Sequence, residues 1–207
     1  MTHPSNLITD YLLAIICIVL AVHLGRSAMA RGSSALKLWA ISYLTTAVAA
    51  MTGGTYHGLF GILGDVGATI LWEVTVYAIG LTSLTMLAAS VTTVVAPGRR
   101  IFWIVPIVAK FVVFAWWMSH HDAFVYVIAD LALAILGIVV LHAWHSLRTG
   151  DKAHVRVIVA MLIAVAGAVL QQWKLSLHAH FDHNDLYHMA QIISLIVLSR
   201  ALLAMRA

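Results

Sequence analysis

The chain is a succession of long apolar runs separated by short polar stretches. An α-helix rises about 1.5 Å per residue, so a run of some twenty apolar residues crosses the ~30 Å hydrocarbon core of a bilayer. The pattern predicts seven such helices, at residues 8–24, 35–60, 66–95, 101–118, 123–147, 157–177 and 185–205. We therefore expect an all-α, polytopic membrane protein with seven transmembrane helices that form a single domain over residues 1–207.

Composition and charge extend this prediction to orientation. With 62% hydrophobic and 10% charged residues, the chain has too few charges to cover a water-soluble surface. In an alternating seven-span arrangement the basic loop residues gather on one side and most acidic residues on the other. The positive-inside rule then places the N-terminus outside and the C-terminus in the cytoplasm. We expect a plasma membrane or bacterial inner membrane location, and no nucleic-acid partner because the basic loops face anionic headgroups.

Ionisable side chains recur at one depth in the outer half of the predicted bundle. Converting sequence position to depth places them in a single layer contributed by five helices. Isolated ionisable groups are costly in hydrocarbon, so such a set predicts a shared polar cavity that opens outward. The members of this layer are His57, Glu73, Asp130, Lys174, Asp185 and His188.

The polar segment 178–188 contains four histidines and leads into the last predicted helix. Asn184, Asp185 and His188 are spaced so that they share one helical face. Either Asp182 or Asn184 is expected to cap this helix, which leaves His183 in non-helical backbone. The remaining histidines of the segment, His178 and His180, are assigned to the rim of the cavity. Three histidines near the opposite ends of the helices are interpreted as interfacial: His142, His145 and His154.

Imidazole and carboxylate groups at one depth suit Zn²⁺, whose catalytic sites keep one position for water. Zinc lowers the pKa of that water and polarises a carbonyl group, and Glu73 would then act as the proton shuttle. In an outer-leaflet cavity the accessible amide or ester belongs to a lipid. The sequence thus predicts a zinc-dependent lipid hydrolase, with candidate ligands His57, His183, Asp185 and His188.

These residues also resemble a known superfamily that includes the alkaline ceramidases and the progestin and adipoQ receptors. The likeness rests on seven spans, His57 near the end of the second, Glu73 on the third and the motif 184–188 at the start of the seventh. It implies a zinc site and lipid amide hydrolysis, with Glu73 and Asn184 as candidate catalytic residues. Two positions depart from the family pattern: Gly53 replaces a serine, and Asn184 replaces a ligand histidine. The third ligand is therefore left open between His183, Asp185 and a water molecule.

Three other functions remain open at this point. A non-catalytic seven-span sensor or receptor would use the outer histidines to bind a metal or respond to pH. A proton-coupled carrier would use Glu73, Asp130 and Lys174 as a relay, although the inner halves of the helices are apolar apart from Lys110. Bis-imidazole haem binding is least favoured, because the histidines do not form pairs at matched depth.

Overall fold

The computed structural model describes residues 4–178 and 181–205, and nearly all of them are helical. The helices are α1 (Pro4–Arg31), α2 (Ser34–Val94), α3 (Arg100–Met118), α4 (Phe124–Thr149), α5 (Lys152–Gln172) and α6 (His183–Ala204), with a short 3-10 helix, η1 (Pro97–Arg99), before α3. All six α-helices are long and apolar enough to cross a membrane. The prediction of an all-α protein is confirmed.

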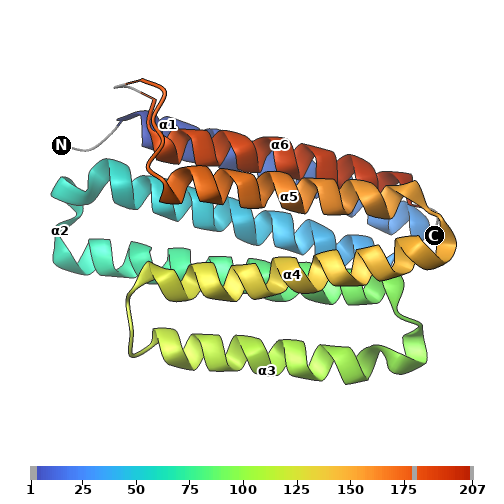
Figure 1. The fold of residues 1–207 in the computed structure, drawn as a ribbon. Coiled ribbons are helices and arrows are strands. Elements are labelled where there is room, and N and C mark those ends of the chain that lie inside the picture. Colours follow the sequence, from blue (N-terminus) through green and yellow to red (C-terminus); the bar gives the residue numbers. More distant parts are fainter. Residues whose placement is uncertain (1–3, 179–180, 206–207) are drawn as a thin grey trace.

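The 61-residue α2 is bent back on itself at Gly64. In Figure 1 its two limbs run side by side in opposite directions. Hydrogen bonds of 2.8 Å between Thr45 and Thr82 and between Thr52 and Thr75 join the limbs. Gly64 has φ 64° and ψ 170°, a combination that is essentially restricted to glycine. The loop predicted between the second and third spans is therefore a turn at one residue.

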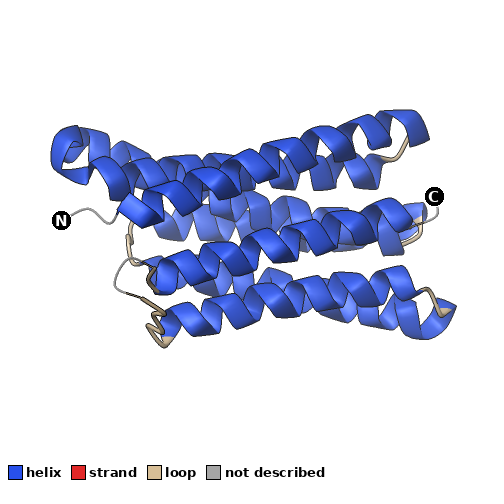
Figure 2. Cartoon of the chain, turned by 90° about the horizontal axis from the view of Figure 1, so that it is seen from above, coloured by secondary structure: helices blue, strands red, loops and turns tan. Residues whose placement is uncertain are grey.

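The helices pack along one common direction, as Figures 1 and 2 show. α1 packs on α2 and α6, and α5 packs on α6, whereas α3 lies at one edge of the bundle and contacts mainly α2. Trp39, Tyr43 and Leu198 are among the largest buried side chains of the core. Large apolar side chains such as Ile15 and Val113 face outward, more than half exposed. An apolar exterior around a packed core is what a membrane protein requires.

Several helix ends differ from those predicted from hydropathy. α1 extends to Arg31, and the polar segment 148–156 is helical except around Gly150 and Asp151. Gly150 ends α4 in the left-handed conformation with φ 71°, and the Asp151 side chain accepts a hydrogen bond of 2.8 Å from the Ala153 amide. Local capping therefore extends these helices through residues that hydropathy assigned to loops.

A buried ion pair links the peripheral helix α3 to the rest of the bundle. The Lys110 ammonium group on α3 pairs with the Asp130 carboxylate on α4 and donates a 2.9 Å hydrogen bond to Ser83 Oγ on α2. The Asp130 side chain is only 7% exposed. Asp130 was expected to share a polar cavity with the other ionisable residues, but it is not among the described residues that line the large cavity and pairs with Lys110.

Candidate functional site

A cavity of about 680 Å³ lies between the two limbs of α2 and helices α1, α4, α5 and α6. Most of its lining is apolar, with Met86, Ile135 and Met161 as typical members. Its polar side chains come largely from the end of the bundle where α6 begins: Asn6, Asp10, His57, Gln171, Gln172, Asn184, Tyr187, His188 and Gln191. The volume is that of an ordinary small-molecule site. A lining that is polar at one end and apolar elsewhere suits an amphiphilic ligand.

His188 is the centre of the polar end of this cavity. Its Nδ1 lies 2.9 Å from the hydroxyl group of Thr9, and its Nε2 lies 3.2 Å from Asp10 Oδ1. The Thr9 hydroxyl group also lies 2.9 Å from Asp185 Oδ1. Two residues of α1 thus hold both nitrogens of an imidazole ring that belongs to α6.

One arrangement of protons satisfies this network. With Asp185 ionised, the Thr9 hydroxyl group donates to it, because a carboxylate only accepts. The Thr9 oxygen then accepts the Nδ1–H of His188, which leaves the lone pair on Nε2. Nε2 and Asp10 Oδ1 would be two facing acceptors unless they share a proton. The His188–Asp10 pair is therefore suited to take up and release one proton at the cavity wall.

Asp10 reaches this position because Gly54 lets α1 approach α2 closely. A Cβ atom at Gly54 would lie 2.6 Å from the Cβ of Asp10, which is too close for any real contact. One carboxylate oxygen, Asp10 Oδ2, is buried and has no hydrogen-bond partner among the described residues. Sequence reasoning counted Asp10 only among the outer acidic residues. The available signal was that Asp10 lies inside the first apolar run, where a carboxylate needs a partner.

The start of α6 is held by a capping box. Asp182 Oδ1 accepts hydrogen bonds from the amides of Asn184 (2.8 Å) and Asp185 (3.3 Å), and Asp185 Oδ2 accepts one of 3.0 Å from the Asp182 amide. The expected cap at Asp182 is confirmed. His183 was expected in non-helical backbone, but it is the first residue of α6, because the cap lies immediately before it.

Replacing Asp182 should make the free energy of unfolding less sensitive to a fall in pH. Burial would raise the pKa of Asp182, but the amides of Asn184 and Asp185 and the side chain of Asn6 donate to its carboxylate and hold the pKa below its ordinary value. The stabilisation is thus complete above the unfolded-state pKa and is lost as the pH falls through the lower folded-state pKa. Asp182→Ala should lower the free energy of unfolding by about 1 kcal/mol at neutral pH.

Unfolding in mixed detergent micelles at neutral and acidic pH measures this effect. Asp182→Asn is the matched control, because an asparagine caps a helix but does not titrate in this range. An equal loss in the alanine and asparagine variants at neutral pH would contradict the capping role. If the alanine variant loses as much stability between neutral and acidic pH as the wild type, the lowered pKa of Asp182 does not contribute to the pH dependence of stability.

The other predicted site residues divide into two groups. His57 and Asn184 line the cavity, and His57 lies near enough to His188 for their charges to interact. Asn184 accepts a hydrogen bond of 2.9 Å from the side chain of Gln171. Glu73 and Lys174 are exposed and are not among the described residues that line the cavity. The expected rim residue His180 lies outside the described residues, and His178 pairs with Phe181 in an isolated β-bridge.

The residues fit the predicted zinc site only in part. His188 Nε2 and Asp10 Oδ1 are 3.2 Å apart, close to the ~3.3 Å between two ligands of a tetrahedral zinc ion. However, within residues 4–178 and 181–205 no three His, Cys, Asp or Glu side chains form a group able to hold a metal ion. Asp185 is fully buried in its contacts with Thr9 and the cap, and neither it nor His183 lines the cavity. The four expected ligands are not brought together.

Zinc binding stays a prediction that elemental analysis can test. If zinc is held at this end of the bundle, His57→Ala and His188→Ala should each abolish stoichiometric zinc in the purified protein. His120→Ala is the matched control, because His120 is an exposed histidine outside the cavity lining. Unchanged zinc in both cavity variants would contradict a site that contains these two histidines.

The histidines at the other end of the helices are not interfacial as expected. His142 is fully buried and His154 is 4% exposed, and their Nδ1 atoms lie 2.9 Å apart. The ring of His145 lies 4.3 Å from that of His154, measured between centroids. Their helices, α4 and α5, are joined by the short turn at Gly150, which brings both sets of side chains into one packed cluster. Hydropathy alone placed them at the membrane surface.

Comparison with known proteins gives a family but no activity. A family described as being of unknown function (DUF6962) matches residues 5–207, and the chain belongs to this family. No curated protein and no solved structure matches the chain. The resemblance to the alkaline ceramidases and adipoQ receptors stays a prediction, so a functional proposal has to rest on the geometry of the cavity.

Proposed function

We propose that the protein is an integral membrane hydrolase that cleaves an ester or amide bond of a lipid inside the large cavity. The observation that carries this proposal is the His188–Asp10 pair, 3.2 Å apart, at the polar end of a long apolar cavity. A lipid likewise has a polar ester or amide linkage at one end of a long apolar chain. The pair then lies beside the linkage, and the apolar lining surrounds the chain.

The chemistry assigned to the pair is proton transfer during hydrolysis. His188 and Asp10 take one proton from a water molecule as its oxygen attacks the carbonyl carbon of the lipid. They return this proton to the departing oxygen or nitrogen as the bond to the carbonyl carbon breaks. Thr9 and Asp185 act behind the ring as positioning residues, because they hold Nδ1 and keep Nε2 directed at Asp10. One water molecule is consumed, and the pair ends in its initial protonation state.

The proposal includes seven membrane crossings with the N-terminus outside. The two antiparallel limbs of α2 and the five other helices supply these crossings. Arg31, Arg100 and Arg148 lie at the helix ends opposite the polar end of the cavity. By the positive-inside rule, these arginines support a cytoplasmic location for the end of the bundle that carries them. The His188–Asp10 pair then faces the outer leaflet.

Cysteine labelling tests this orientation. In a Cys17→Ala background, a membrane-impermeant maleimide added to intact cells should label Asp122→Cys but not Gly98→Cys. Asp122 lies in the connection between α3 and α4, and Gly98 lies in η1 before α3, so the two positions are at opposite ends of one helix. Both should react after detergent is added. Labelling of Gly98→Cys alone in intact cells would contradict the orientation.

Lipid turnover by the purified protein tests the proposed activity. Ester and amide lipids that carry one labelled acyl chain are incubated with the protein in detergent, and the released fatty acid is measured. Release that depends on protein concentration, and that Asp10→Asn lowers strongly, is the expected result. No release from any lipid that binds in the cavity would contradict the proposal.

The alternative function is that of a sensor that binds a lipid-like ligand without cleaving it. One observation favours it: both nitrogens of His188 have protein partners, and the described residues do not form a complete metal site. In that case the network from Asp185 through Thr9 to Asp10 would couple ligand binding to the contact between α1 and α6. Saturable lipid binding without turnover distinguishes the sensor from the hydrolase.

A further inference from the structure

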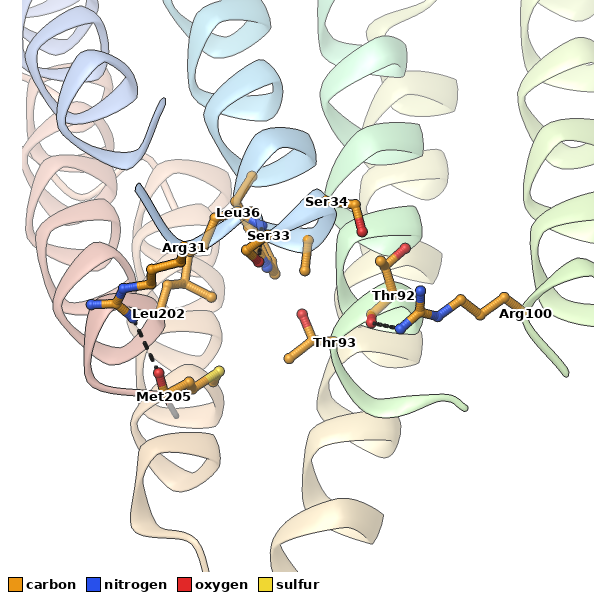
Figure 3. A pocket seen from close by; sticks show the side chains of 12 residues that line it. Arg31, Ser33, Ser34, Leu36, Thr92, Thr93, Arg100, Leu202 and Met205 are labelled. Carbon is orange, nitrogen blue, oxygen red and sulfur yellow. Dashed lines mark hydrogen bonds between the residues drawn. The ribbon is translucent and has the colours of Figure 1, made fainter. Parts of the chain in front are cut away.

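A second pocket lies at the opposite end of the bundle from the His188–Asp10 pair. It has a volume of about 310 Å³ and forms where α1 ends, α2 begins and the second limb of α2 meets α3. Figure 3 shows Thr93 near its middle, with Arg31 and Arg100 on opposite sides. Ser34 and Thr92 add hydroxyl groups to the lining, which includes no carboxylate among the described residues. The pocket plays no part in the proposed hydrolysis.

The two arginines are held in place by backbone carbonyl groups. Arg31 donates to the carbonyl oxygens of Leu203 (2.9 Å) and Met205 (3.2 Å) at the end of α6. Arg100 donates to those of Thr92 (2.8 Å) and Val95 (3.0 Å) at the end of α2. A guanidinium group has five N–H donors, so each retains donors for another acceptor. Within residues 4–178 and 181–205, no carboxylate in the lining neutralises either charge.

The first turn of α2 adds further donors to the same pocket. The amide groups at the start of a helix have no partner within the helix, and the helix dipole gives that end a partial positive charge. Ser33 caps the amide of Leu36, at 3.3 Å, while Ser34 and Ala35 of the same turn line the pocket. Oxygen atoms of an anion would balance these donors.

An independent observation at Trp39 points to a missing acceptor. Trp39 lines the pocket and is fully buried, yet its Nε1–H has no hydrogen-bond partner among the described residues. Indole nitrogen is only a donor, and a buried donor without an acceptor is costly. An oxygen atom of a ligand in the pocket would supply that acceptor once the side chains that cover Nε1 move aside.

We propose that this pocket binds the phosphate group of an anionic lipid headgroup. Arg100, the start of α2 and the Trp39 N–H group match the several oxygens and the negative charge of a phosphate, and Arg31 adds positive charge from the opposite side of the pocket. Leu36 and Leu202 also line the pocket, so an apolar surface lies next to the phosphate position where the glycerol and acyl chains attach. Pockets that combine basic residues with apolar helix surface at the cytoplasmic side are suited to such headgroups.

Binding of fluorescent phosphatidylglycerol to the full chain in neutral detergent micelles tests the proposal. Fluorescence anisotropy should show saturable binding, and Arg100→Gln should weaken it about tenfold, as expected for the loss of charge-assisted hydrogen bonds. Trp39→Phe should weaken it by a smaller factor, because the ring keeps its place and only the donor is lost. Arg99→Gln is the matched control, since Arg99 carries the same charge, is exposed and lies outside the pocket lining.

Competition and fold controls make each outcome decisive. Inorganic phosphate and phosphatidylcholine are added separately as competitors, and each variant is checked for unchanged thermal unfolding. If Arg100→Gln does not fold, Trp39→Phe and Thr93→Val carry the test. Equal weakening by Arg99→Gln and Arg100→Gln would overturn the proposal, because it would show attraction to a charged surface alone. Tight binding of inorganic phosphate without binding of the lipid would overturn it as well.

Discussion

His188→Ala should lower the rate of lipid hydrolysis by about a hundredfold or more, because a positioned acid–base group typically contributes that much. His188 is the side chain whose Nε2 faces Asp10 at 3.2 Å, so the variant removes both the base and the partner of the carboxylate. The rate of fatty acid release by purified protein, with lipid at saturating concentration, measures the effect. A rate equal to that of the wild type would contradict the proposed function.

Three further variants separate the roles of the residues around His188. Asp10→Asn should lower the rate by a comparable factor, because an amide cannot share the proton. Thr9→Val should lower it less, and Thr9→Ser should restore it, since serine keeps the hydroxyl group that holds Nδ1. His120→Ala should leave the rate unchanged, because His120 is exposed and outside the cavity lining. A loss in His120→Ala as large as in His188→Ala would indicate general damage to the protein.

Lys110→Met should destabilise the protein by about 3 kcal/mol, because removing one partner of a buried ion pair leaves the other charge uncompensated. Asp130 is 7% exposed and has its second carboxylate oxygen buried without a partner among the described residues. Its charge therefore depends on the ammonium group of Lys110. The free energy of unfolding in mixed micelles, measured by helix content against denaturing detergent, reports the loss.

A double substitution identifies the cause of that loss. Lys110→Met combined with Asp130→Asn removes both charges, and it should recover much of the stability lost in Lys110→Met alone. Lys110→Arg keeps the positive charge and should remain closer to the wild type. If the double variant is as unstable as the sum of the two single variants, the buried charge is not the cause.

Much of the fold could be predicted from hydropathy, because the length of an apolar run fixes whether a helix crosses a bilayer. The all-α class and the position of α3 follow from this rule. Polar helix ends do not, since Gly150 and Asp151 end and begin helices through local capping. The joint between the second and third spans was predicted at residues 61–65, where Gly64 lies, but hydropathy did not show that the turn takes a single residue with positive φ.

The candidate site was predicted in part. His57, Asn184 and His188 line the cavity as their depth and helical phase suggested. Asp10 and Thr9 were missed, because depth alone does not tell which face of the first helix meets α6 or that Gly54 lets this helix approach α2 closely. Glu73 has a suitable depth but is not among the described residues that line the cavity, because depth alone does not tell which face of a helix meets the cavity.

The turn at Gly64 also bears on where the cavity meets the bilayer. Residues 34–63 and 65–94 form two limbs of about 45 Å each, longer than the ~30 Å hydrocarbon core of a bilayer. In the proposed seven-span topology, the tip of this hairpin would therefore stand in the headgroup region and not in the hydrocarbon. His57 lies seven residues before Gly64, about 10 Å below the tip. At that level lipids carry their ester and amide linkages, so a lipid would need little vertical displacement to present its linkage at the mouth of the cavity.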